Sequence, residues 1–310
     1  MQKRVKVLVV IIVAVLISTG IGGYCLYAHD RDIWLDSVCN HYFAPESRNV
    51  VKDMVNSDEQ TIDAGGYHFV LKEYIYESTV DYGYFLIEVT KKGTNMNKLF
   101  EDYKGEAVKG ALESGCNIVP EYVLEITGVP VRFKLEKETT RNKIYIYGQF
   151  ESNPIMEEDS FKIGIRKKYI NQYGVLIDES ASPEGEFELK GTECSKMYKY
   201  EKYNIVVTPF MLFYHQTKYN EDMLPEFEIY FKDGSESEMY DSNFRSYPDE
   251  AEGKEYGDNV RLERGAQSSF EINGEFYEDK KFDCYYFTNP VALDEIERIE
   301  TCGEEAEFVK

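Results

Sequence analysis

The sequence predicts a mainly β protein in which two β-sandwich domains follow one N-terminal transmembrane helix. Short segments with hydrophobic and polar residues in alternation recur along the chain, as in half-buried strands. The chain is rich in Tyr (26) and Phe (18) but has a single Trp, and Tyr and Phe rings favour strands, where they cover a sheet face. Many short strands with few helices between them favour β-sandwiches.

The N-terminal hydrophobic segment, residues 7–28, contains no charged residue. As a helix it is about 33 Å long, enough to cross the hydrocarbon core of a bilayer. Lys3, Arg4 and Lys6 precede it, and mainly acidic residues follow it. The positive-inside rule then makes residues 1–6 a cytoplasmic tail and places the rest of the chain outside the cytoplasm. The expected location is therefore the cell membrane, with a single pass and an extracytoplasmic body.

Two other interpretations of this segment stay open. Gly20 and Gly22 are small residues at the −3 and −1 positions of a signal-peptide cleavage site. Cys25 could be a lipoprotein site, although Tyr24 stands where a small residue is expected. An uncleaved signal anchor leads, because Tyr24 and Leu26 extend the apolar stretch to membrane-spanning length.

The remaining chain divides into three parts. Residues 29–58 are predicted to form a helical stalk, and residues 59–190 a first β-sandwich domain with an inserted helix at about residues 97–114. A stretch rich in Gly, Ser, Pro and Glu precedes a new series of strands. We therefore expect the second β-sandwich domain to cover residues 191–310.

The alternation also predicts which side chains share a sheet face. Strands of an antiparallel sheet commonly bury one face and expose the other. On this basis we expect one face to carry Tyr67, Phe69, Leu71 and Ile75, and in the next strand Phe85, Ile87 and Val89 to lie opposite Tyr84, Leu86 and Glu88.

The charge of the chain limits its partners. The formal net charge is −22, which repels phosphate backbones and makes nucleic acid a poor partner. Anionic headgroups would repel the body in the same way. The membrane contact is therefore expected through the N-terminal helix, and a protein partner in the envelope fits better. An acidic surface that serves solubility alone is the simpler alternative.

Six cysteines are present. Cys25 lies in the hydrophobic segment, which leaves an odd number in the body and argues against a full disulfide framework. Cys284 and Cys302 fall in the same C-terminal region, and an exported compartment would permit a disulfide between them. The alternative is that all of these cysteines are small buried apolar residues.

Motifs of catalysis are missing from the sequence, which shows no HExxH, GxSxG, P-loop or GxGxxG pattern in a suitable context. The four histidines (His29, His41, His68 and His215) are not at metal-ligand spacing, and we interpret His68 and His215 as ordinary strand residues. No catalytic residue and no cofactor is predicted. A secreted hydrolase stays an alternative, since two carboxylates suffice for glycoside hydrolysis.

Calcium is the metal that this acidic composition could hold, because it prefers oxygen ligands. Aligned to an EF-hand from Asp241, the densest acidic loop has Arg245 and Ser246 where a ligand and a Gly are required, so that motif fails. A looser site and a solvated acidic loop remain the two alternatives. The candidate ligands are Asp241, Asn243, Asp249, Glu252 and Asp258. Tyrosine richness would also suit a module that stacks on cell-wall glycan.

Several segments resemble an extracytoplasmic domain-of-unknown-function family that occurs on Gram-positive anti-sigma-factor-like membrane proteins. Residues 62–93 (IDAGGYHFVLKEYIYESTVDYGYFLIEVTKKG) are similar to the opening of that domain. Residues 203–215 (YNIVVTPFMLFYH), 228–239 (EIYFKDGSESEM) and 287–299 (FTNPVALDEIERI) are similar to its C-terminal partner domain.

The resemblance covers about residues 60–308 and implies paired immunoglobulin-like β-sandwiches with an envelope-stress or surface-interaction role. It implies no catalytic residues. Only six residues precede the hydrophobic segment, so we expect no cytoplasmic anti-sigma domain. The expected function is a non-enzymatic, membrane-anchored protein with a protein-interaction or envelope-sensing role. The alternative is a surface module that binds cell-wall glycan or calcium.

Overall fold

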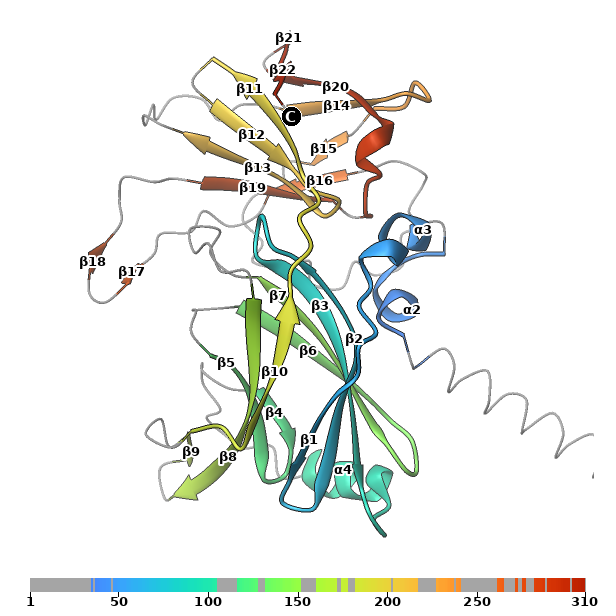
Figure 1. The fold of residues 1–310 in the computed structure, drawn as a ribbon, viewed down its shortest axis with the longest axis vertical. Helices are drawn as coiled ribbons and strands as arrows, with labels where there is room; N and C mark the ends of the chain where they lie inside the picture. Colours follow the sequence, from blue (N-terminus) through green and yellow to red (C-terminus); the bar gives the residue numbers. More distant parts are fainter. Residues whose placement is uncertain are drawn as a thin grey trace, which may run out of the picture.

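The protein is mainly β, with several antiparallel sheets and short helices (Figure 1). The expectation from the alternation that the chain is mainly β is confirmed. The structure, a computed structural model, describes residues 35, 37–45, 47–104, 116–127, 132–151, 160–171, 174–177, 182–201, 203–216, 227–236, 238–240, 261–264, 271–272, 275–276, 282–287, 289–301 and 303–309.

The first sheet pair consists of two sheets that share one apolar core. In spatial order, one sheet contains β1 (Gln60–Ala64), β2 (Tyr67–Glu77), β3 (Tyr82–Lys91), β7 (Ile144–Glu151) and β6 (Arg132–Thr139). The facing sheet contains β10 (Gly185–Lys190), β8 (Ser160–Asn171), β5 (Tyr122–Thr127) and β4 (Cys116–Val119), and β9 (Gly174–Ile177) pairs with β8. Helix α4 (Met96–Lys104) lies at one end of the pair. The core includes Phe69 and Ile87 of the first sheet and Ile163 and Phe187 of the second, all with no exposed surface.

The second sheet pair lies beyond the other end of the first (Figure 1). Its larger sheet contains, in order, β15 (Glu238–Tyr240), β16 (Arg261–Arg264), β19 (Phe282–Phe287), β13 (Met211–Gln216), β12 (Tyr203–Val207), β11 (Lys196–Tyr200) and β22 (Glu307–Phe308). The smaller sheet contains β14 (Phe227–Phe231), β20 (Ile296–Thr301) and β21 (Glu304–Glu305), with the 3-10 helix η2 (Leu293–Glu295) before β20. Two short strands, β17 (Glu271–Ile272) and β18 (Glu275–Phe276), form a two-stranded sheet. A separate core lies between the larger and the smaller sheet of this pair, with Ile205 and Ile229 fully buried in it.

A β-bulge in β2 changes the predicted face of one residue. Leu71 pairs with Ile87 and Glu73 pairs with Leu86, so Lys72 is the extra residue of the bulge. One inserted residue exchanges the two faces of a strand beyond it. Tyr67, Phe69 and Leu71 therefore face the core between the sheets as expected, but Ile75 lies on the outer face. The sequence-based prediction for Ile75 was wrong because it assumed regular alternation along the whole of β2, and the bulge interrupts that alternation.

The outer face of the first sheet is also buried, contrary to the expected exposed face. Tyr84 and Leu86 of β3 and Tyr147 of β7 form a second apolar cluster there. The residues that cover it come from two parts of the chain that are far apart in sequence: Leu35, Val38, Phe43, Val51 and Met54 in one part, and Phe210 and Met211 in the other. Aromatic residues on both faces of one strand thus indicate that both faces of the sheet are buried.

The segment from Leu35 to Met54 supplies most of this cover; we call it the docking segment. It contains α2 (Val38–Tyr42), α3 (Arg48–Val51) and the 3-10 helix η1 (Lys52–Met54). We expected a helical stalk over residues 29–58, but these short helices lie against the sheet beside the junction of the two sheet pairs (Figure 1). Val38 and Val51 have no exposed surface, and burial of each such side chain contributes about 1.5–3 kcal/mol.

The segment between β10 and β11 is fastened to the tip of the β2–β3 hairpin. Glu77, at the end of β2, is fully buried, and its carboxylate accepts hydrogen bonds from the backbone N–H groups of Val80 (3.1 Å) and Cys194 (3.0 Å). The N–H of Thr192 donates to the carbonyl of Tyr76 at 2.8 Å. These bonds to buried groups hold the place where the chain passes from the first sheet pair to the second.

The predicted hydrophobic segment, residues 7–28, lies outside the described residues. Within the part of the chain that the structure describes, no helix is long and apolar enough to cross a membrane. The immunoglobulin-like topology and the domain limits at residues 59–190 and 191–310 stay predictions.

His41 of α2 ties the docking segment to the sheet. Its ring stacks on Tyr147, with centroids 3.7 Å apart and planes 5° apart, and its Nε2 lies 3.1 Å from a carboxylate oxygen of Glu136 in β6. In the neutral ring Nε2 therefore carries the proton and donates it to Glu136, and Nδ1 carries no proton. Nδ1 is buried and has no hydrogen-bond partner among the described residues. Protonation would place an N–H there without an acceptor.

Burial lowers the pKa of His41, against the opposing effect of Glu136 and Glu138 and with a further lowering by Lys134. The unfolded chain keeps a histidine pKa of about 6.5, so the folded protein binds fewer protons than the unfolded one. The stability that neutral His41 provides is complete above that value. It is lost as the pH falls toward the lower folded pKa.

Acidification should therefore weaken the packing of the docking segment, and the replacement His41→Phe should remove this part of the pH dependence while it keeps the ring stack. Thermal unfolding of the full chain in detergent between about pH 7.5 and about pH 5.5 measures the effect. Asn49→Ala, at an exposed residue of the same segment, is the control. Equal pH profiles for the wild type and His41→Phe would contradict the account.

Candidate functional site

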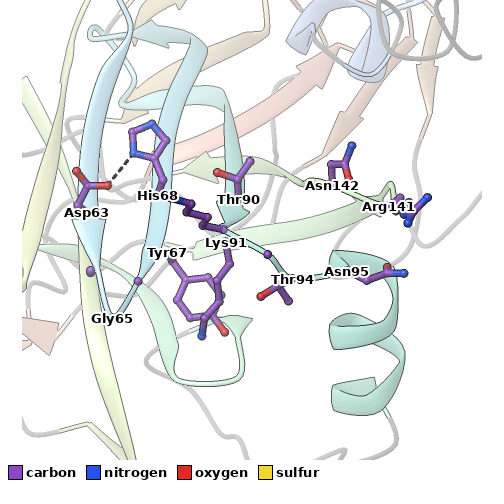
Figure 2. Close-up of a pocket in the computed structure, with 14 residues that line it drawn as sticks. Asp63, Gly65, Tyr67, His68, Thr90, Lys91, Thr94, Asn95, Arg141 and Asn142 are labelled. Carbon is purple, nitrogen blue, oxygen red and sulfur yellow. Dashed lines mark hydrogen bonds and ion pairs between the residues drawn. The ribbon is translucent and has the colours of Figure 1, made fainter.

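A pocket of ≈ 890 Å³ lies at the end of the first sheet pair that is remote from the second pair. Three turns that are far apart in the sequence form it: the β1–β2 turn, the segment from the end of β3 to α4, and the β6–β7 turn. Figure 2 shows the side chains around it, and it is open to solvent on one side. The volume lies within the range of small-molecule sites, about 300–1,000 Å³.

The β1–β2 turn is the tightest part of the pocket wall. Ala64 pairs with Tyr67, so only Gly65 and Gly66 connect the strands. Both have positive φ, +57° and +80°, as in the two-residue turn that matches the twist of a hairpin. A Cβ on Gly65 would lie 2.5 Å from the hydroxyl of Tyr122 in the facing sheet. The turn can therefore pack closely on the sheet only with glycine at this position.

Backbone hydrogen bonds join the other two turns. The N–H of Met96, the first residue of α4, donates to the carbonyl of Arg141 in the β6–β7 turn at 2.9 Å. Asn95 caps the helix, because its side-chain oxygen accepts from the N–H of Lys98 at 3.2 Å. The N–H of Thr94 donates to the carbonyl of Lys91 at 3.1 Å. These bonds fix the start of α4 and Arg141 at one side of the pocket.

The charge of the pocket is opposite to that of the whole chain. Lys91, Lys92 and Arg141 line it, and Asp63 is the one acidic residue among its described lining residues. Within the described residues, these three cations have no carboxylate at ion-pair distance, in contrast to Lys143, which lies 2.8 Å from Glu88. Asp63 instead lies 2.8 Å from Nδ1 of His68. The pocket therefore has an excess of positive charge that the described protein does not neutralise.

Tyr67 positions one of these cations. The Nζ of Lys91 lies 4.0 Å from the centroid of the Tyr67 ring, which restricts the lysine through a cation–π contact. The ring is buried. This burial, with a smaller contribution from Glu121, raises the pKa of Tyr67 to about 12. Tyr67 is therefore a neutral hydrogen-bonding and stacking group at neutral pH, and the pocket can hold an anion by charge and by the hydroxyl and amide groups of Thr90, Thr94, Asn95 and Asn142.

The sequence-predicted sites do not contribute to this pocket. The calcium candidates Asp241, Asn243, Asp249, Glu252 and Asp258 lie outside the described residues. So does Cys302, and only the backbone of Cys284 is described, in β19. Among the residues that the structure describes, no group of three His, Cys, Asp or Glu side chains could hold a metal ion.

Other predicted residues are placed by the structure. His68 and His215 lie in β2 and β13, as expected of strand residues. Cys39 and Cys194 are free thiols. Burial and the nearby Glu73 raise the pKa of Cys39 to about 11, with Arg48 opposing, so this thiol is unreactive at neutral pH.

Sequence reasoning missed the pocket. The Gly-Gly pair was a readable signal for a two-residue hairpin turn, and Asn95 was a readable helix cap. Neither signal shows that the β1–β2 turn, the start of α4 and Arg141 come to line one pocket.

Comparison with known proteins adds no named family. No family model matches the chain, and no curated protein matches it. A solved structure described as the conserved domain protein from Bacillus anthracis is similar at a TM-score of 0.38 and 9% sequence identity. The similarity covers 80% of this chain and 76% of that chain.

The replacement Gly65→Ala should destabilise the protein more than Gly93→Ala. Both positions have positive φ, and a non-glycine residue there costs about 1–2 kcal/mol. A Cβ at Gly93 meets no atom within 4 Å, whereas one at Gly65 meets Tyr122, and such overpacking adds about 1–3 kcal/mol. Denaturant unfolding of the two variants compares them, and an equal loss in both would show that the turn does not pack as described.

Proposed function

We propose that this chain is a non-enzymatic, single-pass membrane-anchored protein whose β-rich body lies outside the cytoplasm and senses a component of the cell envelope. The hydrophobic residues 7–28 and the basic residues before them support the anchor and its orientation. The family resemblance in residues 60–308 agrees with an extracytoplasmic interaction role.

One structural observation carries the sensing role: the same two strands connect the pocket with the docking segment. β2 begins at Tyr67 and β3 ends at Lys91, and both residues line the pocket. At their other ends, Ile75 of β2 and Tyr82 of β3 belong to the cluster that holds Val38 and Phe43. A ligand that stiffens or shifts the pocket ends of these strands therefore acts on the surface that holds the docking segment.

The docking segment is the part of the described body that follows the hydrophobic segment in sequence. Its residue Phe43 stacks on Phe210 of the second sheet pair, with centroids 6.1 Å apart. A change at the sheet surface can thus act on the membrane-proximal chain and on both sheet pairs. Packed elements with two discrete arrangements are the physical basis of such coupling.

Membrane fractionation of the full chain in a Gram-positive host tests the anchor. We expect the chain in the membrane fraction after a high-salt wash, an N-terminus at Met1, and digestion of the body by protease added to intact protoplasts. Deletion of residues 7–28 should release the chain from the membrane fraction. A mature chain that starts near residue 23, or a body protected from external protease, would refute the proposal.

A further inference from the structure

We propose that the pocket binds the phosphate group of a small phosphate monoester through Lys91, Lys92 and Arg141. This inference rests on the proposed function, because it names the class of ligand that the sensing body recognises.

Among the described residues, no carboxylate lies at ion-pair distance from the three cations of the pocket. On a chain of net charge −22, these cations lie around one depression whose described lining contains a single acidic residue, Asp63, and Asp63 is directed to His68. Figure 2 shows Lys91 over Tyr67, while Arg141 stands on the opposite side, at the β6–β7 turn. A ligand with two negative charges would satisfy most of this excess. A divalent cation would be repelled.

The pocket also supplies hydrogen-bond donors from several directions. Thr90 and Thr94 contribute hydroxyl groups, and Asn95 and Asn142 contribute amides. Arg141 offers a planar fork of N–H groups that suits phosphate oxygens, whereas lysine ammonium groups act as point charges. A tetrahedral phosphate has three free oxygens that diverge toward such a set. A planar carboxylate has two.

The pocket also has room for the organic part of the ligand. A pocket of ≈ 890 Å³ has more room than a phosphate ion needs, and the turn glycines Gly65 and Gly66 add no side chain to its wall. Tyr67 holds Lys91 at one side of this space through the cation–π contact. The pocket can therefore accept a polar group such as a sugar or polyol beside the phosphate.

The negative charge of the chain favours a small ligand over a long one. A polymer with many phosphates would extend from the pocket across the acidic surface of the remaining chain, and repulsion from that surface opposes it. A single phosphate monoester carries its charge only where the three cations are.

Isothermal titration calorimetry of the full chain in detergent tests the proposal with four probes: glucose 6-phosphate, inorganic phosphate, glucose and glucuronate. We expect saturable binding of glucose 6-phosphate and weaker binding of inorganic phosphate. Glucose should not bind, and glucuronate should bind at least about tenfold more weakly than glucose 6-phosphate, because its carboxylate carries one negative charge and offers one oxygen fewer to the charged donors.

Lys92→Ala and Arg141→Ala should each reduce the affinity for glucose 6-phosphate about tenfold or more. Arg141→Lys should lie between Arg141→Ala and the wild type, because it keeps the charge and loses the fork. Lys232→Ala removes an exposed cation from the turn after β14 and should change nothing. Equal thermal unfolding of all four variants shows that the effects are not due to misfolding.

The proposal is overturned if neither phosphate probe binds, or if Lys92→Ala and Arg141→Ala bind glucose 6-phosphate as the wild type does. Binding of a glycerol phosphate polymer without binding of glucose 6-phosphate would also overturn it. None of these results alters the membrane fractionation and protease pattern, so failure of the ligand is distinguishable from failure of the membrane-anchored function.

Discussion

Burial of both faces of the first sheet is the constraint on which the rest of the structure depends. β3 shows it most clearly, since Phe85 and Ile87 face the core between the sheets while Tyr84 and Leu86 face the docking segment. A strand with apolar side chains on both faces cannot be left at a surface without a large loss of hydrophobic stabilisation. The docking segment covers this face together with Phe210 and Met211 of the second sheet pair. The positions of the docking segment and of the second sheet pair therefore both depend on the first sheet.

The same constraint links the fold to the proposed function. The docking segment covers the end of β2 and the start of β3. The pocket lies at the opposite ends of these strands, at Tyr67 of β2 and Lys91 of β3. Polar contacts fix the position of the docking segment on the sheet. His41 pairs with Glu136, and the N–H of Val38 donates to a carboxylate oxygen of Glu73 at 3.0 Å. The cover is therefore positioned by specific bonds, and its docking can respond to pH and to events in the sheet.

The sequence predicted the fold class and most strands, because alternation at period two is a local property of each segment. It placed Tyr67, Phe69 and Leu71 on one face, and all three lie in the first core. It failed where the answer depended on distant partners. The bulge at Lys72 moved Ile75 to the other face, and the docking segment is held by a sheet surface that no local pattern identifies. The pocket was missed for the same reason, since Lys91 and Arg141 come to line one pocket only after folding.

Amide hydrogen exchange on the full chain in a bilayer nanodisc tests the central claim, that the docking segment is a fixed part of the sheet's cover. The account predicts slow exchange at Phe43 and Val50, whose N–H groups donate within the segment, with protection that approaches that of β3. Replacement of Tyr147 by Ala, which removes the ring under His41, should raise exchange in the segment before it does so in the core between the two sheets. Fast exchange across the docking segment in the wild-type protein, with β3 fully protected, would contradict the account.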